Sequence, residues 1–415
     1  MRRETVDVCI IGAGPAGLAA GIAASKEGVD DVLILDRNRE AGGILFQCIH
    51  NGFGLHLFKE DLTGPEYAQR FIREAEKRGI KIKPETVVLK INKKKEVIAS
   101  TRGEGIFKVM AKAIVLATGC REKTRHMLHI PGYRPSGIFT AGLAQQFINI
   151  EGYLPGKKAV ILGSGDIGLI MARRLTLEGA KVLAVVEIMP YPGGSTRNVA
   201  MCLQDFDIPL FLEHTVIFIH GKRRLEGVTV AKVNSDKKPI FGTEKFIPCD
   251  TLLVAAGLIP ESELCSEAGI EIDAFTQGPV VDEKMQTSVE GIFACGNVCQ
   301  VQDLVDYVSY QGEIAGKNAA RFVLGKMSPF SRFIKIKRGE NIRMVVPQLI
   351  SGKEPVNLFI RVKRPQEDVR LCVGEGLLEK HFSFVKPNQM IVWKVPFDKL
   401  NLGKIKELEI KLVNK

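Results

Sequence analysis

Two glycine-rich segments have residue types and spacings that suit nucleotide binding. The first, Gly12-Ala13-Gly14-Pro15-Ala16-Gly17, directly follows the apolar run Val6–Ile11, and a second apolar run ends on Asp36. In this pattern Gly12 permits a tight turn, Gly14 lets a pyrophosphate approach the backbone, and Gly17 lets the next helix pack against the strand. The N–H groups that begin this helix attract phosphate, and an acid 24 residues after Gly12 suits a ribose hydroxyl. The segment predicts a dinucleotide site.

The pattern occurs a second time in the chain. The strand-like run Lys158–Leu162 leads into Gly163-Ser164-Gly165-Asp166-Ile167-Gly168, and a later run ends on Glu187, again 24 residues after the first glycine. Each half also has an apolar run that ends in small residues, Ala117-Thr118-Gly119 in the first and Ala256-Gly257 in the second. Two such halves in one chain indicate two nucleotides that face each other.

The elements around these segments must position them. Apolar periodicity predicts a helix after each glycine segment, ending near residues 27 and 178, and further helices over about 64–78 and 304–324. Strand-like runs occupy 32–35, 87–91, 97–100, 107–110, 113–116, 182–186 and 251–255. Strand, glycine turn, helix and strand in this order predict an α/β protein.

The pattern changes after Met327-Ser328-Pro329, which we expect to be a linker. About seven short strand-like runs follow, including 341–346, 356–362, 369–373 and 390–395. This spacing predicts a small antiparallel sandwich. Phe330 to Lys415 contains 18 Lys and Arg against nine Asp and Glu, so this part carries nine of the chain's eleven net positive charges.

Composition limits the class of protein. The 415 residues allow two or three domains, and the 45% hydrophobic content allows sizeable cores. Nine scattered cysteines, an odd number, argue for a reducing compartment and against a disulfide framework. The first apolar segment could be taken for a signal peptide or a membrane anchor, but it contains the glycine motif and a proline. No run reaches the ~18 uninterrupted apolar residues of a membrane span. We therefore expect a soluble, cytoplasmic protein.

Together the motifs resemble the flavoproteins with two dinucleotide-binding domains, the pyridine nucleotide-disulfide oxidoreductase superfamily, over about residues 1–328. In that family the first glycine segment binds FAD and the second binds NAD(P)H. A second FAD signature of the family is matched by Thr287–Asn297, except that Asn297 replaces an Asp that hydrogen-bonds the ribityl chain. An Asn can still accept through its carbonyl oxygen. The next helix, which begins around Asp306–Val308, points its N-terminus at the flavin in the family, where its dipole stabilises negative charge.

The resemblance implies domains and binding residues. It implies an α/β fold with two Rossmann-like domains for FAD (1–120 and 257–328) and NAD(P)H (121–256), plus a small C-terminal all-β, sandwich-like domain (329–415). The residues expected at FAD are Gly12, Gly14, Pro15, Ala16, Gly17, Asp36, Arg37, Gly43, Val87, Ala117, Thr118, Gly119, Gly296, Asn297 and Val308. Those expected at NAD are Gly163, Gly165, Asp166, Ile167, Gly168, Glu187, Ala256 and Gly257.

Charge favours NAD(H) over NADP(H) as the co-substrate. A carboxylate at Glu187 accepts a hydrogen bond from the 2′-hydroxyl and repels a 2′-phosphate. The residues that follow it, Ile188–Tyr191, include no basic side chain. Arg197 is the first basic residue after Glu187 and keeps NADP(H) open as the alternative.

The cysteines depart from the dithiol patterns of the family. One branch carries Cys-x4-Cys after the first acid, where this chain has Cys48 alone, and another carries Cys-x-x-Cys within a stretch that corresponds to 136–157, which has no cysteine. We therefore expect no disulfide reduction. Cys48 is either a packing residue or a thiol that reacts with the flavin or an acceptor, and it is our one candidate catalytic residue.

The remaining cysteines and histidines do not predict a metal site. Cys295 and Cys299 flank the flavin signature, and we expect them to pack rather than to form a redox pair. Cys120, His126 and His129 lack a second pair of ligands at zinc spacing. We expect no metal.

At finer grain, residues 48–68 and 117–125 resemble one subgroup of the family. It includes the FAD/NAD subunits of opine oxidase, hydrogen cyanide synthase and dye-linked proline dehydrogenase, and small flavoproteins of anaerobes that accompany glycerol-3-phosphate-dehydrogenase-like proteins. This implies a flavoenzyme that moves electrons between NAD(H) and a second acceptor or donor through FAD, as a subunit of a larger dehydrogenase complex. The alternatives are a free-standing NADH oxidase, or mainly a docking subunit whose basic C-terminal domain binds an acidic partner dehydrogenase. We expect no nucleic-acid partner, because that domain has no recognised binding motif.

Overall fold

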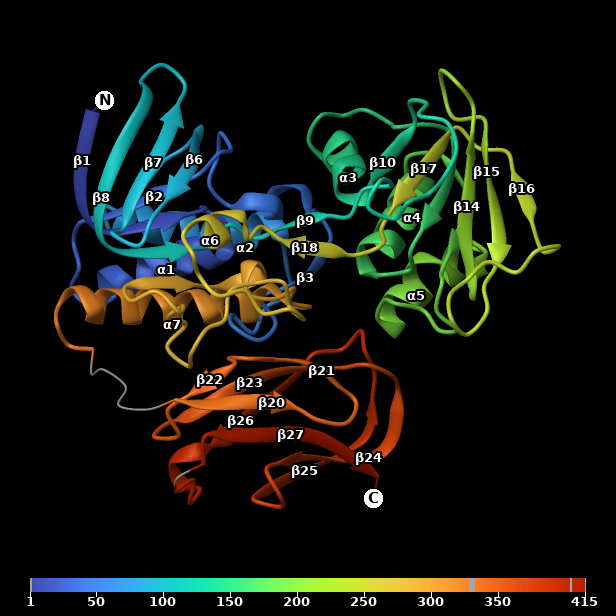
Figure 1. Cartoon of the computed structure of the whole chain (residues 1–415). Helices are drawn as coiled ribbons and strands as arrows, with labels where there is room; N and C mark the ends of the chain where they lie inside the picture. The colour runs from blue at the N-terminus through green and yellow to red at the C-terminus, as the bar shows by residue number, and fades with distance from the viewer. Residues whose placement is uncertain (1, 328–332, 404, 415) are drawn as a thin grey trace. The chain divides into compact units, whose positions relative to one another are not determined.

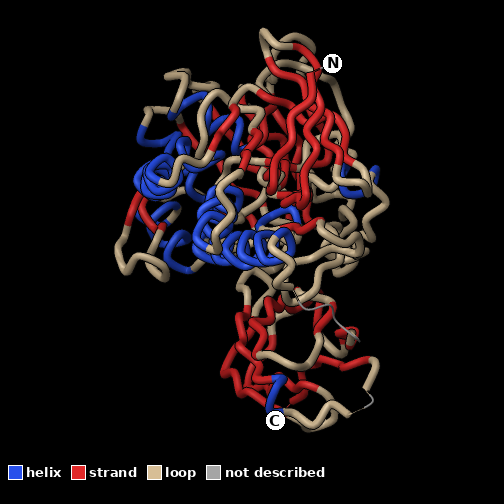
Figure 2. The backbone as a smooth tube through the Cα atoms, turned by 90° about the vertical axis from the view of Figure 1, so that its left-hand side faces the viewer, coloured by secondary structure: helices blue, strands red, loops and turns tan. Residues whose placement is uncertain are grey.

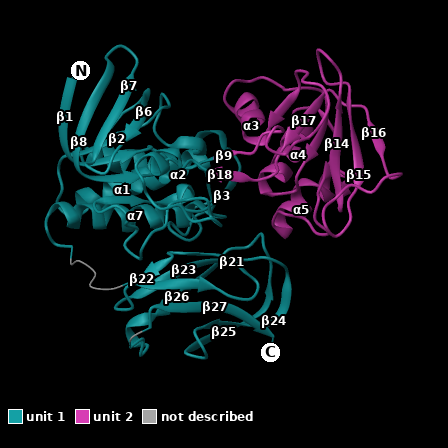
Figure 3. Cartoon of the chain, in the orientation of Figure 1, with its two compact units in different colours: residues 1–120, 260–415 teal, residues 121–259 magenta. Residues whose placement is uncertain are grey.

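The computed structural model describes residues 2–327, 333–403 and 405–414. The chain forms two compact units, residues 1–120 with 260–415 and residues 121–259 (Figure 3). The chain passes from one unit to the other twice, at β9 (Cys120–Glu122) and at β18 (Leu258–Pro260), and these two strands pair with each other. The expected linker falls partly outside the described residues, at Ser328 and Pro329.

The first unit is built on a seven-stranded sheet in the order β5-β2-β1-β8-β7-β6, with β19 also paired to β8 (Figure 1). Its strands are β1 (Arg2–Ile11), β2 (Val32–Leu35), β5 (Lys81–Lys83), β6 (Thr86–Ile91), β7 (Glu96–Thr101), β8 (Gly105–Leu116) and β19 (Ile292–Ala294). β8 is one strand where the sequence suggested two. Its first half pairs antiparallel with β7 and its last three residues pair parallel with β19, so both halves are held in one extended line.

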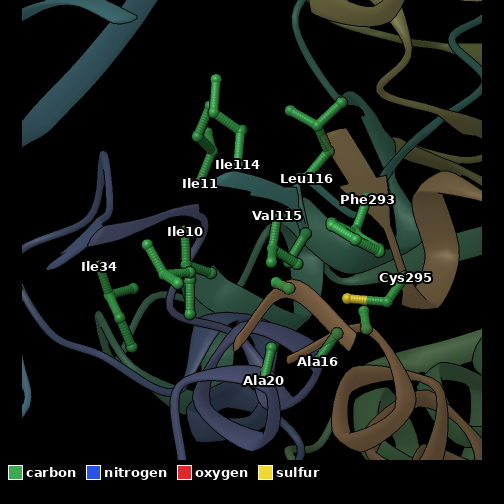
Figure 4. Packing of buried hydrophobic residues seen from close by; sticks show 14 of the residues in the cluster. Ile10, Ile11, Ala16, Ala20, Ile34, Ile114, Val115, Leu116, Phe293 and Cys295 are labelled. Carbon is green, nitrogen blue, oxygen red and sulfur yellow. The ribbon is translucent and has the colours of Figure 1, made fainter. Parts of the chain in front are cut away.

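Helices α1 (Pro15–Lys26) and α7 (Val305–Val323) pack closely against each other in this unit. A Cβ added to Gly312 would lie 2.2 Å from the Ala16 carbonyl oxygen, and one added to Gly316 would lie 1.9 Å from that of Ala20. The two helix backbones can therefore touch only because these positions are glycine. Figure 4 shows Ala16 and Ala20 beneath apolar side chains of the central strands, in the main core of the unit.

Shorter elements complete the first unit. They are η1 (Gly43–Gln47), β3 (Asn51–Phe53), β4 (Leu62–Thr63), α2 (Gly64–Lys77), α6 (Glu263–Glu267) and η3 (Gly296–Val298). α2 begins where the sequence predicts. Thr63 and Glu66 form a capping box, and Pro65 occupies the first turn, where its missing N–H is not needed.

The second unit contains a five-stranded parallel sheet in the order β10-β17-β11-β12-β13. Helices cover one face and a three-stranded antiparallel sheet, β14-β15-β16, covers the other, because alternate residues of the strands enter two different cores. The parallel strands are β10 (Ile138–Thr140), β11 (Lys158–Leu162), β12 (Lys181–Val186), β13 (Leu210–Phe211) and β17 (Thr251–Val254). The others are α3 (Ala141–Asn149), α4 (Asp166–Leu177), α5 (Thr196–Cys202), η2 (Gln204–Phe206), β14 (His214–His220), β15 (Gly227–Lys232) and β16 (Lys245–Ile247).

The C-terminal residues from 333 onward form two sheets, β22-β20-β27-β24-β25 and β21-β23-β26, around one apolar core that includes Trp393 (Figure 2). The strands are β20 (Ile334–Arg338), β21 (Ile342–Val346), β22 (Leu349–Ile350), β23 (Pro355–Val362), β24 (Gln366–Val373), β25 (Leu378–Val385), β26 (Ile391–Pro396) and β27 (Glu407–Asn414), with a short turn η4 (Phe397–Lys399). We call these residues the C-terminal β module.

The C-terminal β module contacts the rest of the first unit. The Val281 N–H donates to Oε1 of Gln348 (3.0 Å), and the Val281 carbonyl accepts from the Gln348 N–H (3.1 Å). The carboxylate of Glu283 accepts from the N–H of Ser351 (2.7 Å) and from its hydroxyl. Residues 281–283 therefore tie the module to the segment that precedes β19.

None of the helices in the described ranges is long and apolar enough to cross a bilayer.

Asp282 makes stability depend on pH. Its side chain is 2% exposed, and burial raises its pKa from 3.8 to about 7, although it accepts hydrogen bonds from the N–H groups of Lys284 and Gln286. Between these two values the folded protein holds a proton that the unfolded chain has released, so stability falls as pH rises through this range.

We expect the free energy of unfolding to fall between about pH 5 and about pH 8 by ~1–3 kcal/mol more in the wild type than in Asp282→Asn, whose side chain cannot ionise. Thermal and denaturant unfolding across this range measure it. Exposed Asp398→Asn is the matched control and should follow the wild type. The same pH dependence in Asp282→Asn would contradict the assignment.

Candidate nucleotide-binding sites

The first glycine loop is crowded at its two ends and open in the middle. Gly12 has φ +107°, and a Cβ there would lie 2.3 Å from the Ala117 carbonyl oxygen; a Cβ on Gly17 would lie 1.8 Å from the carbonyl oxygen of Gly12. A Cβ on Gly14 would meet no heavy atom of the described residues within 4 Å. α1 begins directly after Gly14, and none of the described side chains caps it. Its first N–H groups therefore face open space, as a phosphate requires.

The second glycine loop repeats this geometry in the other unit. Gly163 has φ +105°, and a Cβ there would lie 2.3 Å from the Ala255 carbonyl oxygen; a Cβ on Gly168 would lie 2.3 Å from that of Gly163. Gly165 is open in the same way as Gly14, and again no described side chain caps the helix that follows, α4. Both loops thus fit a pyrophosphate.

The two acids hold the two loops in the same manner. Asp36 accepts from the N–H of Ala13 (2.5 Å) through one oxygen and from that of Asn38 (2.7 Å) through the other. Glu187 accepts from the N–H of Ser164 (2.9 Å) and from that of Met189 (2.9 Å). Both carboxylates are buried, at 6% and 7% exposure. Both oxygens of Asp36 and Oε1 of Glu187 each retain a lone pair that a ribose hydroxyl can use, whereas Oε2 of Glu187 also accepts from the Ser164 hydroxyl.

One glycine of a Gly-Gly pair after each acid lies against one side of the middle glycine of its loop, and the direction of that glycine's own Cβ stays open. A Cβ on Gly43 would lie 3.0 Å from Cα of Gly14, and a Cβ on Gly193 would lie 3.3 Å from N of Gly165. Gly43 was expected at the site, whereas Gly193 was missed. The signal was available, because a Gly-Gly pair begins six residues after the acid in both halves.

Ser164 is a second residue that the sequence reasoning did not single out. Its hydroxyl donates to Glu187 (2.6 Å) and accepts from the N–H of Gly193 (2.7 Å). It therefore joins the acid, the glycine loop and the loop that contains Gly193 in the second unit. The first unit has Ala13 at this position and lacks that hydroxyl link.

Several other predicted FAD residues lie together in the first unit. A Cβ on Gly296 would lie 2.8 Å from Cβ of Ala16 and 3.1 Å from Cγ1 of Val308, so the second flavin signature contacts the start of α1 and the start of α7. The Gly296 N–H donates to Oε1 of Gln311 (3.1 Å). These contacts bring segments almost 300 residues apart to one place.

The outer FAD candidates surround the same loop. The half-exposed Val87 follows Thr86, whose N–H donates to the Asp36 carbonyl (2.8 Å). The Thr118 hydroxyl donates to the carbonyl of Glu261 (2.8 Å), and the Gly119 carbonyl accepts from the N–H of Glu261 (2.9 Å). Arg37 is exposed, with its Nη1 3.9 Å from a carboxylate oxygen of Glu261.

The remaining NAD candidates divide into two groups. Asp166 accepts from the N–H of Ser195 (2.8 Å) and from Nδ2 of Asn198 (2.6 Å), so it holds the start of α5 beside the loop. Ile167 packs against the helical core of the unit. Ala256 and Gly257 follow β17, and Gly257, with φ +104°, accepts from the N–H of Lys123 (3.0 Å).

Asn297 and the loop after it have the polar groups that a flavin site needs. Oδ1 of Asn297 accepts from the Gln302 N–H (3.0 Å), and its Nδ2 donates to Sγ of Cys120 (3.5 Å). Among the described residues, the buried side-chain amides of Gln300 and Gln302 and Oδ1 of Asp306 find no hydrogen-bond partner. Because buried polar groups rarely stay unpaired, a polar ligand at this loop fits the residues present.

The cysteines have no dithiol character in this structure. All nine lie within the described ranges, and none of them forms a disulfide. Burial raises the pKa of Cys48 to about 12, and that of Cys295 to about 12. Burial, with Cys295 and Cys265 nearby, raises the pKa of Cys299 well above the usual value of a thiol. Cys295 lies beside Phe293 in the main core (Figure 4), so these groups are protonated at neutral pH and favour the packing interpretation.

Comparison with known proteins places these sites in a family. Residues 6–314 match the pyridine nucleotide-disulphide oxidoreductase family. The chain belongs to this family. Members of this family are oxidoreductases that use FAD and NAD(P)H.

Individual relatives agree with the family. An opine oxidase subunit of Agrobacterium tumefaciens is 26% identical over 77% of this chain and 66% of its own length, and the NADH oxidase of Methanocaldococcus jannaschii is 28% identical over 75% and 69%. The chain thus spans just under two thirds of that opine oxidase polypeptide. The crystal structure of T. acidophilum thioredoxin reductase has the same fold, with a TM-score of 0.63, 24% identity and coverage of 77% of this chain and 99% of that one. The expected resemblance to opine oxidase subunits and the expected family, whose members use FAD and NAD(P)H, are confirmed.

We expect Glu187→Gln to weaken NADH binding about tenfold, because the neutral amide loses a charge-assisted hydrogen bond worth ~1.4 kcal/mol. The FAD absorption spectrum should not change, since Glu187 lies in the other unit from the first glycine loop. Titration of the purified flavoprotein with NADH under anaerobic conditions measures this. Exposed Glu151→Gln in the same unit is the control. Unchanged NADH affinity in Glu187→Gln would remove this residue from the site.

We expect NADH to reduce the flavin of the Cys48→Ala variant within about twofold of the wild-type rate, because a protonated, partly buried thiol is a poor nucleophile. Turnover of glutathione disulfide or DTNB should be negligible in both proteins. Anaerobic stopped-flow and steady-state assays decide it. Robust disulfide turnover that is lost in a folded Cys48→Ala protein would show that the thiol is catalytic.

Proposed function

We propose that the protein transfers electrons between NAD(H) and a second acceptor or donor through FAD, with FAD on the first glycine loop and NAD(H) on the second. The observation that carries this proposal is the matched pair of loops, each open at its middle glycine and each held by a buried acid. Bound FAD supplies a ring that exchanges a hydride with nicotinamide. We assign FAD to residues 1–120 with 257–328 and the nicotinamide nucleotide to 121–256, close to the change of compact unit at residue 260.

The chain's own residues bind and orient rather than supply acid or base. The N–H groups at the starts of α1 and α4 hold phosphates, and Asp36 and Glu187 hold ribose hydroxyls. The start of α7, where Val308 contacts Gly296, provides the positive end of a helix dipole for the flavin. Positioning the two rings and excluding water are sufficient for hydride transfer.

NAD(H) is the proposed nicotinamide nucleotide. Glu187 is 7% exposed and both of its oxygens already accept hydrogen bonds, so a 2′-phosphate beside it would meet a fixed negative charge. Arg197 on α5 is the first basic residue after Glu187 in the chain, and its Nε donates to Sδ of Met201 at 3.4 Å.

We also propose that the protein works as one component of a larger cytoplasmic dehydrogenase. The opine oxidase relative is named as one subunit of its enzyme, and residues 330–415 have nine net positive charges that suit an acidic partner flavoprotein. The nine scattered cysteines support the cytoplasm. A free-standing NADH oxidase is the second candidate, because one relative carries that name.

The purified protein should carry about one FAD per chain, and NADH should bleach it anaerobically at least about tenfold faster than NADPH. Heat release and chromatography identify the flavin, and stopped-flow absorbance gives the rates. Asp36→Asn should lower FAD content, with exposed Asp30→Asn as its control. FMN in place of FAD, or equal rates with the two nucleotides, would contradict the proposal. Rapid oxygen consumption by the isolated chain would favour the NADH oxidase.

A further inference from the structure

Arg361, at the end of β23 in the C-terminal β module, reaches out of its own sandwich. Its Nη2 is 2.5 Å from Oδ1 of Asp303 and donates to the Val301 carbonyl at 3.3 Å, while its Nη1 donates to the Pro387 carbonyl at 2.8 Å. The other oxygen of Asp303 accepts from the Met390 N–H at 2.5 Å. One guanidinium thus joins the loop between β25 and β26 to residues 301 and 303.

These two residues lie on the loop that leads from the second flavin signature into α7. Between them is Gln302, whose N–H donates to Oδ1 of Asn297. Val301 and Asp303 are both fixed by Arg361, so the direction of the Gln302 N–H is fixed as well. Asn297 is the residue that we assign to the ribityl chain, and its side-chain amide is oriented by that N–H.

An apolar contact next to the ion pair supports the same loop. Phe359 of β23 lies against Tyr307 and Tyr310 of α7, with ring centroids 5.8 Å and 6.4 Å away. Nδ2 of Asn357 donates to the Tyr310 hydroxyl at 2.5 Å. The first turns of α7 are therefore packed on the β21-β23-β26 sheet.

The Arg361–Asp303 pair differs from the other ion pairs of the module by its burial. Its two side chains are 12% and 27% exposed, against 69% and 66% for Arg364 and Glu340. Exposed pairs contribute little to stability, whereas removing one partner of a buried pair leaves the other charge uncompensated. Loss of Arg361 should therefore release the loop.

We propose that Arg361 is a positioning residue for the flavin: it clamps the loop 301–303 so that Asn297 is held in its FAD-binding orientation. The C-terminal β module is then part of the flavin site as well as a candidate docking surface. The inference rests on the proposed placement of FAD at Asn297.

The test uses the full chain with Arg361→Ala, Arg361→Lys and Asp303→Asn, and Arg364→Ala as the matched control. Hydrogen exchange of the peptide that contains Gln302, measured in the FAD-free protein, should speed up in Arg361→Ala and stay at the wild-type rate in Arg364→Ala. Dissociation of FAD should become about tenfold faster, and the flavin absorption bands should shift. Arg361→Lys should be intermediate, because one ammonium cannot replace contacts to three groups.

The effects of substituting Arg361 and Asp303 on FAD release should also be non-additive. The double variant of Arg361→Ala with Asp303→Asn should release FAD no faster than the worse single variant, because both remove one interaction. Wild-type exchange at Gln302 and wild-type FAD release in folded Arg361→Lys and Asp303→Asn would overturn the clamp.

Asn297→Ala separates the two levels of the proposal. If Asn297→Ala changes FAD release and Arg361→Ala does not, the clamp fails and the placement of FAD stands. If Asn297→Ala leaves the flavin unchanged, the placement itself is wrong.

Discussion

The hydrogen bond between a buried carboxylate and the glycine loop is the interaction on which each half of the molecule depends. Asp36 and Glu187 end strands adjacent to the strands that carry Gly12 and Gly163, and each carboxylate accepts from the residue after that glycine. This geometry requires strand ends in register and a turn without side chains. The same turn explains why β8 and β17 are followed by small residues. The carbonyl oxygens of Ala117 and Ala255 lie directly against Gly12 and Gly163. The fold thereby sets out a phosphate site before any ligand binds.

A second constraint joins distant parts of the first unit. Gly312 and Gly316 let α7 touch α1, and Gly296 touches Ala16 at the helix start. The proposed FAD site is consequently assembled from two stretches of chain that are separated in the sequence by the second unit. The part of this site near Gly296 depends on the position of the first turn of α7. That turn packs against the C-terminal β module through the contact of Tyr307 with Phe359.

Much of the local structure could be predicted because glycine spacing and apolar runs have direct steric causes. Val32–Leu35 and Lys158–Leu162 have the predicted limits, and α7 differs by one residue at each end. The β14-β15-β16 sheet was missed because its strands contain charged and aromatic residues among short apolar runs. Gly193 was overlooked although its spacing from the acid equals that of Gly42. The contact of Arg361 with Asp303, 58 residues apart, has no sequence pattern, since it depends on how a sheet packs against a loop.

The buried cysteine thiols can report local unfolding of the regions that contain them. Seven of the nine cysteines are buried, and they are distributed over the first unit (Cys9, Cys265, Cys295 and Cys299), the second unit (Cys202 and Cys249) and the C-terminal β module (Cys372). A thiol reagent can reach such a group only when its surroundings open. The order in which these sulfurs are alkylated therefore ranks the local stabilities of the three regions, and Cys48 and Cys120, which are partly accessible, mark the start of the time course.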